Sequence, residues 1–356
     1  MMRLPRFRYR APTTLPDAAS WLAEDPANTM LLAGGTDLLP NMKRRHQTPA
    51  TLIALRAVPE LRATASSLDE LGTGGRAVIG AALRLSELVE NPQIRSSYPG
   101  LWQALAQVAT PHLRNMGTIG GNLCLDTRCT YYNQNYEWRK AINFCMKRDG
   151  ATCWVATSSP RCLAVSSTDS APMLQALGAT VRLVSASGRR EIPVGELYAN
   201  DGMHYLTRRP DEILTSISLP NPSGWRSVYW KLRRRGAFDF PVASAAVAAQ
   251  LDGSRVITIR IVLGAVASRP LEATRAMELL ANQPLSDELI EQAAAAAGDV
   301  AKPMDNTDFE LVWRKRMVRT LVANALKEVR GDDMRAERKR LARMEQLSVA
   351  GTDGQA

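Results

Sequence analysis

Hydrophobic and polar positions follow the periods of short helices and strands along most of the chain. In the first part, the pattern predicts helices at 17–24 and 37–44 and strands at 29–33 and 51–55. The next part is predicted to hold strands at 78–82, 180–185 and 212–219, and helices opening at 84–88, 101–108 and 171–177. The mixture of both element types predicts an α+β protein.

The pattern changes after Asn221-Pro222-Ser223-Gly224, which is typical of a linker. Three strands are predicted beyond it, at 227–233, 242–251 and 255–266, with an Asp252-Gly253 hairpin turn after the second. Helices at 270–281, 286–298 and 308–329 follow, and from Gly331 the chain is predicted to be a charged, disordered tail with a short helix extension. The expected divisions are therefore 1–57, 58–222, 223–330 and 331–356.

Composition narrows the class of protein. The chain has 356 residues, 45% of them hydrophobic and 22% charged, which is enough for two or three ordinary domains. No apolar run is long enough to cross a membrane or to act as a signal peptide, so we expect a cytoplasmic protein. The net charge of +10 is scattered and accompanies no nucleic-acid motif, and a basic surface that binds an acidic protein partner fits it equally well.

Two glycine pairs are candidate phosphate-binding loops. One lies in Leu31-Leu32-Ala33-Gly34-Gly35-Thr36-Asp37-Leu38, directly after a predicted strand, and the other in Thr118-Ile119-Gly120-Gly121-Asn122. Glycine lets a backbone approach a ligand closely, and consecutive amides can hold a phosphate. Either pair by itself also fits an ordinary tight turn.

All five cysteines lie in one window. Cys129, Cys145, Cys153 and Cys162 are separated by fifteen, seven and eight residues, and Cys124 stands just upstream. Four thiolates are what an iron–sulfur cluster or a structural zinc requires, but zinc sites usually pair their cysteines more closely. The wide gaps therefore favour a 4Fe–4S cluster, with zinc or unrelated buried thiols as alternatives.

The two glycine motifs resemble the pyrophosphate loops of the flavin subunits of molybdenum hydroxylases, which include xanthine dehydrogenase and aerobic carbon monoxide dehydrogenase. The segment at Asp169, the segment 213–217 before a proline and Tyr229-Trp230-Lys231 follow in that family's order, over residues 3–329. The resemblance implies a two-part FAD-binding domain and a C-terminal domain with a three-stranded antiparallel sheet and helices.

The cysteine insertion, at 123–163, is unusual in that family and resembles the β subunit of 4-hydroxybenzoyl-CoA reductases. This likeness implies that Cys129, Cys145, Cys153 and Cys162 bind a 4Fe–4S cluster, and that Cys124 does not. It also implies a doubled heterotrimer with a molybdenum-cofactor subunit and a 2Fe–2S subunit, which receives electrons from ferredoxin and removes the phenolic hydroxyl. No residue of this chain would then be catalytic. A different molybdenum hydroxylase or a zinc-stabilised, non-redox binding protein are the alternatives.

The family's residue roles carry over by position. The backbone amides of residues 34–37 and of Thr118, Gly120 and Gly121 would hold the FAD pyrophosphate, within loops completed by Leu31, Leu32, Ala33, Leu38, Ile119 and Asn122. Val108 and Leu214 would contact the isoalloxazine, Asp169 would accept hydrogen bonds from ribityl or ribose hydroxyls, and Lys231 would place a positive charge near the flavin. The alternative roles are those of ordinary strand residues for Val108 and Leu214, a helix N-cap for Asp169 and a solvated side chain for Lys231.

Overall fold

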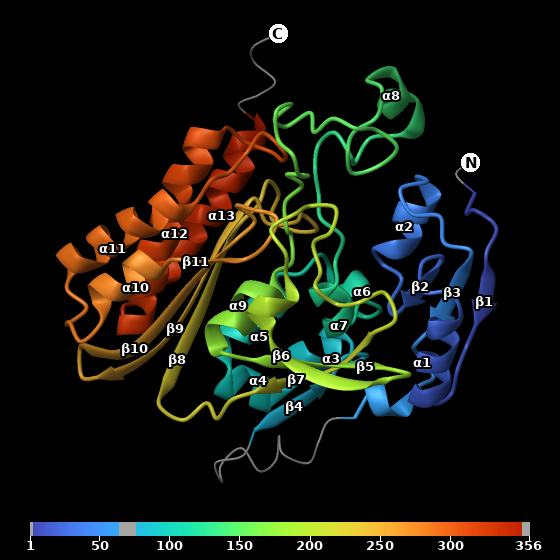
Figure 1. Cartoon of the computed structure of the whole chain (residues 1–356). Coiled ribbons are helices and arrows are strands. Elements are labelled where there is room, and N and C mark those ends of the chain that lie inside the picture. The colour runs from blue at the N-terminus through green and yellow to red at the C-terminus, as the bar shows by residue number, and fades with distance from the viewer. Residues whose placement is uncertain (1–2, 64–75, 351–356) are drawn as a thin grey trace.

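The computed structural model describes residues 3–63 and 76–350, and the side chains of the last helix as far as residue 342. Three sheets and their helices form an N-terminal part, a middle part and a C-terminal part, which lie side by side in Figure 1. The α+β architecture is the one expected. Within the described residues, no helix has both the length and the apolar composition to cross a membrane.

The N-terminal part is a small parallel sheet with the order β1-β3-β2. The Thr14 side chain caps the first helix by accepting a hydrogen bond from the Asp17 amide at 3.2 Å, and the helix buries Ala18, Ala19 and Leu22. The elements are β1 (Arg8–Arg10), α1 (Leu15–Glu24), β2 (Thr29–Leu32), α2 (Leu38–Lys43) and β3 (Thr51–Ala54).

The middle part is an antiparallel sheet with the order β4-β7-β5-β6, packed against short helices. Its strands are β4 (Ala77–Gly80), β5 (Thr180–Ser185), β6 (Gly188–Pro193) and β7 (Ile213–Leu219). Its helices are α3 (Leu85–Glu90), α4 (Pro92–Ser97), α5 (Pro99–Ala106), α6 (Pro111–Arg114), α7 (Ile119–Leu123) and α9 (Ser170–Leu177). Strand β6 and helices α4, α6 and α7 were not among the elements that the hydrophobic pattern predicted.

The C-terminal sheet is covered on both faces, and alternate residues of its strands point to opposite sides. On β8, Val228 and Trp230 pack toward the C-terminal helices, whereas Tyr229 belongs to the core of the middle part. The strands are β8 (Trp225–Leu232), β9 (Ala243–Asp252), β10 (Arg255–Gly264) and β11 (Leu271–Glu272), in the order β11-β10-β9-β8. The helices are α10 (Thr274–Leu280), α11 (Asp287–Val300), α12 (Leu311–Arg330) and α13 (Arg335–Ala350).

One expectation for this part is corrected: the sheet has four strands, because the two-residue β11 pairs with β10. The helix extension expected after Gly331 is α13, which runs as far as Ala350, whereas the disordered end expected beyond it falls on residues 351–356, outside the described chain. Arg338 on α13 stacks over the Trp230 ring at 4.3 Å and pairs with Glu328 at 2.8 Å, so packing stabilises this helix.

The insertion at 123–163 stands above the other parts of the chain and contains only one helix, α8 (Tyr136–Ala141) (Figure 1). It packs on the loop after α2 through His46, which is only 2% exposed. The His46 Nε2 atom lies 3.1 Å from the Gln134 carbonyl oxygen, and its ring centroid is 4.3 Å from that of Tyr132. Burial, with the positive charges of Arg139 and Arg44, lowers the pKa of His46 to about 4, opposed by the Gln134 bond and Asp126.

This histidine predicts a pH-dependent stability. Because the folded-state pKa lies below the usual value of about 6.5, the unfolded chain binds a proton that the folded chain does not. The contribution of His46 to the free energy of unfolding is complete above about pH 6.5 and falls as the pH drops towards 4, by about 3 kcal/mol. Thermal unfolding of the wild type and of His46→Phe at about pH 7 and pH 5 measures it.

The variant should lose part of the drop in melting temperature between the two pH values. His204→Asn is the matched control, because His204 is exposed and its replacement should keep the full drop. An identical pH dependence in the wild type and His46→Phe would contradict the prediction.

Candidate flavin and cluster site

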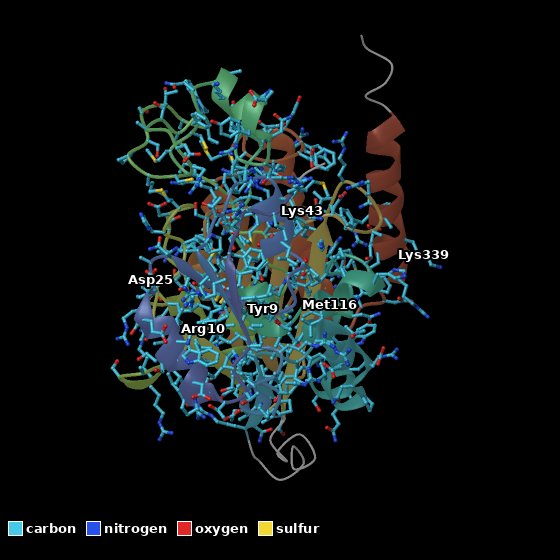
Figure 2. The ribbon with its side chains drawn as sticks, turned by 90° about the vertical axis from the view of Figure 1, so that its right-hand side faces the viewer. Tyr9, Arg10, Asp25, Lys43, Met116 and Lys339 are labelled. Carbon is cyan, nitrogen blue, oxygen red and sulfur yellow. The ribbon has the colours of Figure 1, made fainter. Side chains whose placement is uncertain are left out.

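The two glycine loops lie against each other, although 82 residues separate Gly34 from Gly117. A Cβ atom placed on Gly34 would lie 2.6 Å from the Met116 carbonyl carbon and 2.9 Å from the Gly117 Cα. Real Cβ atoms do not approach backbone so closely, so only glycine allows this contact. Met116 is 48% exposed, and Figure 2, which faces the N-terminal part, labels it.

The first loop offers unpaired backbone donors. Gly35 has a φ of +72°, which turns the chain between β2 and α2. The amides of residues 34–37 donate no hydrogen bond to any described residue, while the Gly35 and Asp37 carbonyls accept the first bonds of α2. Four successive free amides on one turn suit an anion such as a pyrophosphate.

The second loop is organised differently, which corrects the role expected for the amides of Gly120 and Gly121 but not for that of Thr118. The Gly120 amide donates to the Ala81 carbonyl at 2.9 Å, and the Gly121 amide donates to the Thr118 hydroxyl at 3.1 Å. Neither is free for a phosphate. The Thr118 hydroxyl keeps its own proton to donate, and Gly121 leaves the space between Thr118 and Ala33 open, where a Cβ would lie 3.0 Å from that hydroxyl.

Asn122 connects the second loop to the segment that carries Asp169. Its Oδ1 atom accepts from the Thr168 hydroxyl at 2.9 Å, the Ser170 hydroxyl at 2.6 Å and the Ser170 amide at 3.2 Å. Buried carbonyl oxygens require such partners. The bonds hold residues 168–170 beside α7, so the glycine loops and Asp169 belong to one region.

Asp169 and Lys231 form a buried ion pair between the middle and C-terminal parts. The Asp169 carboxylate accepts from the Lys231 ammonium at 3.0 Å and from the Tyr229 hydroxyl at 2.8 Å. Burial raises the pKa of Asp169, and Lys231 and Tyr229 oppose that rise. The carboxylate makes no capping bond to α9, and Lys231 is fully buried, so neither alternative role applies.

The two apolar residues expected near the isoalloxazine lie in or beside the main core. Leu214 is 5% exposed on β7, and Val108 is half-buried before α6. The Val108 carbonyl accepts a bond from Arg114 at 2.8 Å, and Ala109 after it has a φ of +46°. The other residues expected along the glycine loops flank them from β2, α2 and α7: Leu31, Leu32, Leu38 and Ile119.

Asp37 connects the first glycine loop to the cysteine insertion. Its carboxylate forms an ion pair with Arg128 and accepts from the Asp126 amide at 3.3 Å. Arg128 also donates to the Asn41 side chain at 3.1 Å, and it immediately precedes Cys129. The Asp37 side chain of the first glycine loop therefore positions the start of the cysteine insertion.

Four cysteines surround one small enclosed space. Cys129, Cys145, Cys153 and Cys162 are all 4–6% exposed and line it together, with Tyr131, Tyr132, Met146, Lys147, Trp154, Val155 and Ala164 between them. Cys124 lies elsewhere, at the end of α7 against the main core. Four thiols from distant positions in an irregular loop converge here without any disulfide.

Backbone amides lie beside two of the thiols. The Tyr132 amide donates to the Cys129 carbonyl at 3.1 Å, and the Cys162 sulfur accepts from the Ala164 amide at 3.5 Å. Burial raises the pKa of Cys129 to about 12 and that of Cys162 to about 11. These thiols therefore require a bound cationic centre to ionise at neutral pH.

Within the described residues, no three His, Cys, Asp or Glu side chains lie close enough together to hold a single metal ion. A mononuclear zinc site holds its sulfurs about 2.3 Å from one atom, which demands tighter convergence.

Comparison with known proteins identifies the family. Residues 5–222 match the FAD binding domain in molybdopterin dehydrogenase, and residues 227–329 match the CO dehydrogenase flavoprotein C-terminal domain. The chain is an FAD-binding medium subunit of the molybdenum hydroxylase family. The fold expected from the resemblance is confirmed, and the family match supports FAD binding by this subunit.

Relatives of the medium subunit cover almost its whole length. It is 31% identical to the aldehyde oxidoreductase FAD-binding subunit PaoB of Escherichia coli K12, over 90% of this chain and 98% of that one. It is 27% identical to the carbon monoxide dehydrogenase medium chain of Afipia carboxidovorans, over 91% and 96%. A solved carbon monoxide dehydrogenase from Hydrogenophaga pseudoflava superposes with a TM-score of 0.73 at 27% identity, covering 92% of this chain and 98% of that chain.

The sequence indicated the glycine loops and the four thiols, but it missed Asp126, Arg128 and Lys147. These charged residues are buried around the insertion, with exposed fractions of 8% or less. Their positions in the sequence could have indicated them, because all three lie within three residues of a predicted cysteine ligand. Charged side chains next to thiols that are expected to be buried must themselves find partners.

Gly34→Ala tests the contact between the loops. The added methyl group collides with backbone at Met116, and such overpacking typically costs about 1–3 kcal/mol, which the loops can relieve only by separating. We expect the variant to fold but to retain little FAD, measured as the flavin-to-protein absorbance ratio after purification.

Gly236→Ala is the control, because no atom lies within 4 Å of the added Cβ and its φ is not positive. It should keep its flavin. Full flavin retention in Gly34→Ala would show that the close approach of the loops is not needed for binding.

Proposed function

We propose that this subunit carries FAD and a 4Fe–4S cluster, and that it passes electrons from reduced ferredoxin to a molybdenum enzyme that converts 4-hydroxybenzoyl-CoA to benzoyl-CoA. The observation that carries the proposal is the convergence of Cys129, Cys145, Cys153 and Cys162 on one space. When bound, the two groups supply electron transfer in single steps and, at FAD, in pairs.

The residues around the thiols support the cluster. Four sulfurs are the complete ligand set of a 4Fe–4S centre, and the Ala164 amide that donates to Cys162 stabilises anionic sulfur. The surrounding Tyr132, Trp154 and Ala164 keep water away from the site. By the same assignment Cys124, which lies outside this space, is not a ligand.

For FAD, the free amides of residues 34–37 and the Thr118 hydroxyl would bind the pyrophosphate. Asp169 keeps lone pairs for a ribityl or ribose hydroxyl beyond its bonds to Lys231 and Tyr229. Lys231 is bound to Asp169 and to the Gln107 carbonyl at 2.9 Å, so its charge would act on the flavin across this pair.

The insertion also supports a path between the two sites. It leaves the second glycine loop after Asn122 and returns just before Asp169, and the Asp37–Arg128 pair fixes its first cysteine to the first loop. The thiols are therefore held on the flavin side of the subunit by both the chain and a side-chain contact. Electrons entering at the thiols would continue to FAD and then to partner subunits with 2Fe–2S clusters and the molybdenum cofactor.

An acidic ferredoxin is the proposed donor. On the surface of residues 123–163, Lys140, Arg148 and Arg161 outnumber Glu137 and Asp149 by one charge, and Tyr136 and Trp138 are exposed by 46% and 38%. Exposed aromatic side chains favour a protein partner, and the net charge of +10 of the whole chain favours an acidic one, whose association is sensitive to salt. Two electrons and two protons convert the phenolic C–OH bond to C–H and release water, so a reductant is required.

The alternative is an oxidising complex, because a relative at 31% identity is named as an aldehyde oxidoreductase subunit. In that case electrons leave the substrate and travel through this subunit outwards. A zinc-stabilised binding protein remains the non-redox alternative, although the wide sequence gaps between the four cysteines do not favour it.

The cluster assignment predicts a selective loss of iron. Replacing any one of Cys129, Cys145, Cys153 or Cys162 by Ser should lower the iron content towards zero, because each sulfur supplies one ligand. Much of the FAD should remain. Cys124→Ser is the matched control and should keep its iron, measured with flavin on anaerobically purified protein. A Cys145→Ser protein with full iron would remove the ligand assignment.

The direction of electron flow predicts the order of reduction in the assembled complex. After rapid mixing with reduced ferredoxin, the iron–sulfur absorbance should bleach no later than the flavin absorbance, and the rate should fall as ionic strength rises. With 4-hydroxybenzoyl-CoA present, benzoyl-CoA should form, measured by chromatography.

Flavin reduction at the wild-type rate in a Cys145→Ser complex would contradict entry at the thiols. Oxidation of aldehydes by the complex, without turnover of 4-hydroxybenzoyl-CoA, would favour the alternative.

A further inference from the structure

Lys147 is the one cation among the described residues that line the space between the four thiols. Its side chain is 6% exposed, and its ammonium uses all three donors. They reach Asp126 Oδ1 at 2.8 Å, Thr127 Oγ1 at 2.8 Å and the Gly202 carbonyl at 2.7 Å. The charge is therefore fixed in place.

Two aromatic rings complete the surroundings of this ammonium. The Lys147 Nζ atom lies 4.8 Å from the Tyr132 ring centroid and 5.3 Å from that of Tyr205. The rings favour the charged amine and exclude water. Three hydrogen bonds and two rings hold a positive charge in a region of low dielectric, where its effect on neighbouring charge is strong.

The negative partner lies behind the lysine. Asp126 is 3% exposed, accepts from the Tyr132 hydroxyl at 3.0 Å and is not among the residues that line the space. The pair thus presents its positive end to the thiols and its negative end to the interior of the protein. An ion pair between Lys147 and Asp126 that only stabilised the insertion would not need its positive end to face the thiols.

We propose that Lys147 and Asp126 set the reduction potential of the cluster held by the four thiols, Lys147 raising it and Asp126 lowering it. The inference depends on the cluster assignment of the proposed function. Each electron that enters adds one negative charge beside the ammonium, so a nearby cation stabilises the reduced state and a carboxylate destabilises it. Both residues act through the cluster's surroundings and do not bind iron.

The test is a redox titration of the assembled complex, followed by electron paramagnetic resonance of the reduced cluster at neutral pH. Lys147→Met removes the cation and should shift the potential to a more negative value. Asp126→Asn keeps an acceptor for the ammonium, removes the negative charge and should shift the potential to a more positive value. Lys147→Arg retains the charge and should remain nearer to the wild type than Lys147→Met.

Lys140→Met is the matched control. It removes the same charge from the same insertion, but at an exposed position on α8, where solvent and salt screen it. Its potential should equal that of the wild type. A purely structural role of the pair would not move the two buried variants in opposite directions.

Shifts of the same sign in Lys147→Met and Asp126→Asn, or no shift in either, would overturn the inference. If the Lys147→Met variant contains no iron, the test rests on Asp126→Asn alone. A cluster potential in that variant that is unshifted or more negative than in the wild type would then overturn the inference. Wild-type complex without a 4Fe–4S signal would instead defeat the proposed function, so the two failures are distinguishable.

Discussion

The Asp37 carboxylate is the contact on which both halves of the site depend. It stands at the end of the first glycine loop and binds the Arg128 guanidinium and the Asp126 amide, at the entrance to the cysteine insertion. A loop of about forty residues with a single short helix has little backbone structure to orient it. The half-buried ion pair between Asp37 and Arg128, next to Cys129 and supported by His46 and Asn41, supplies that orientation.

Sequence reasoning succeeded where local patterns determine structure. The alternation on β8 to β10 and the apolar side of α11 predicted these elements within a few residues, and Gly34-Gly35 after a strand predicted a turn that leaves amides free. The same reasoning treated Gly120-Gly121 as an equivalent motif. In the folded chain their amides are already bonded, because the pair lies inside α7 and Gly120 packs on Ala81, directly after β4. Gly34-Gly35 leaves its amides free whereas Gly120-Gly121 does not, and only the tertiary contacts of the two dipeptides distinguish them.

Ion pairs between residues far apart in the chain could not be predicted from the pattern of hydrophobic and polar positions. Asp169 and Lys231 were each assigned to the flavin separately, yet they bind each other across 62 residues. Burial forces such a pairing, since an isolated charge inside the protein is costly. The helix extension after Gly331 was expected, but the contacts that hold it were not, because Arg338 pairs with Glu328 on the preceding helix and packs on Trp230 and the Tyr229 carbonyl, which lie about a hundred residues earlier in the chain.

The ion pair between Asp169 and Lys231 also bears on how the protein matures. During synthesis the middle part leaves the ribosome before β8, so Asp169 is present before its partner Lys231 has been synthesised. Burying that carboxylate alone is unfavourable, which keeps the earlier part from closing completely. The flavin-binding region is therefore finished only when the C-terminal sheet has folded against it, and the final assembly of its pocket follows synthesis of the whole chain.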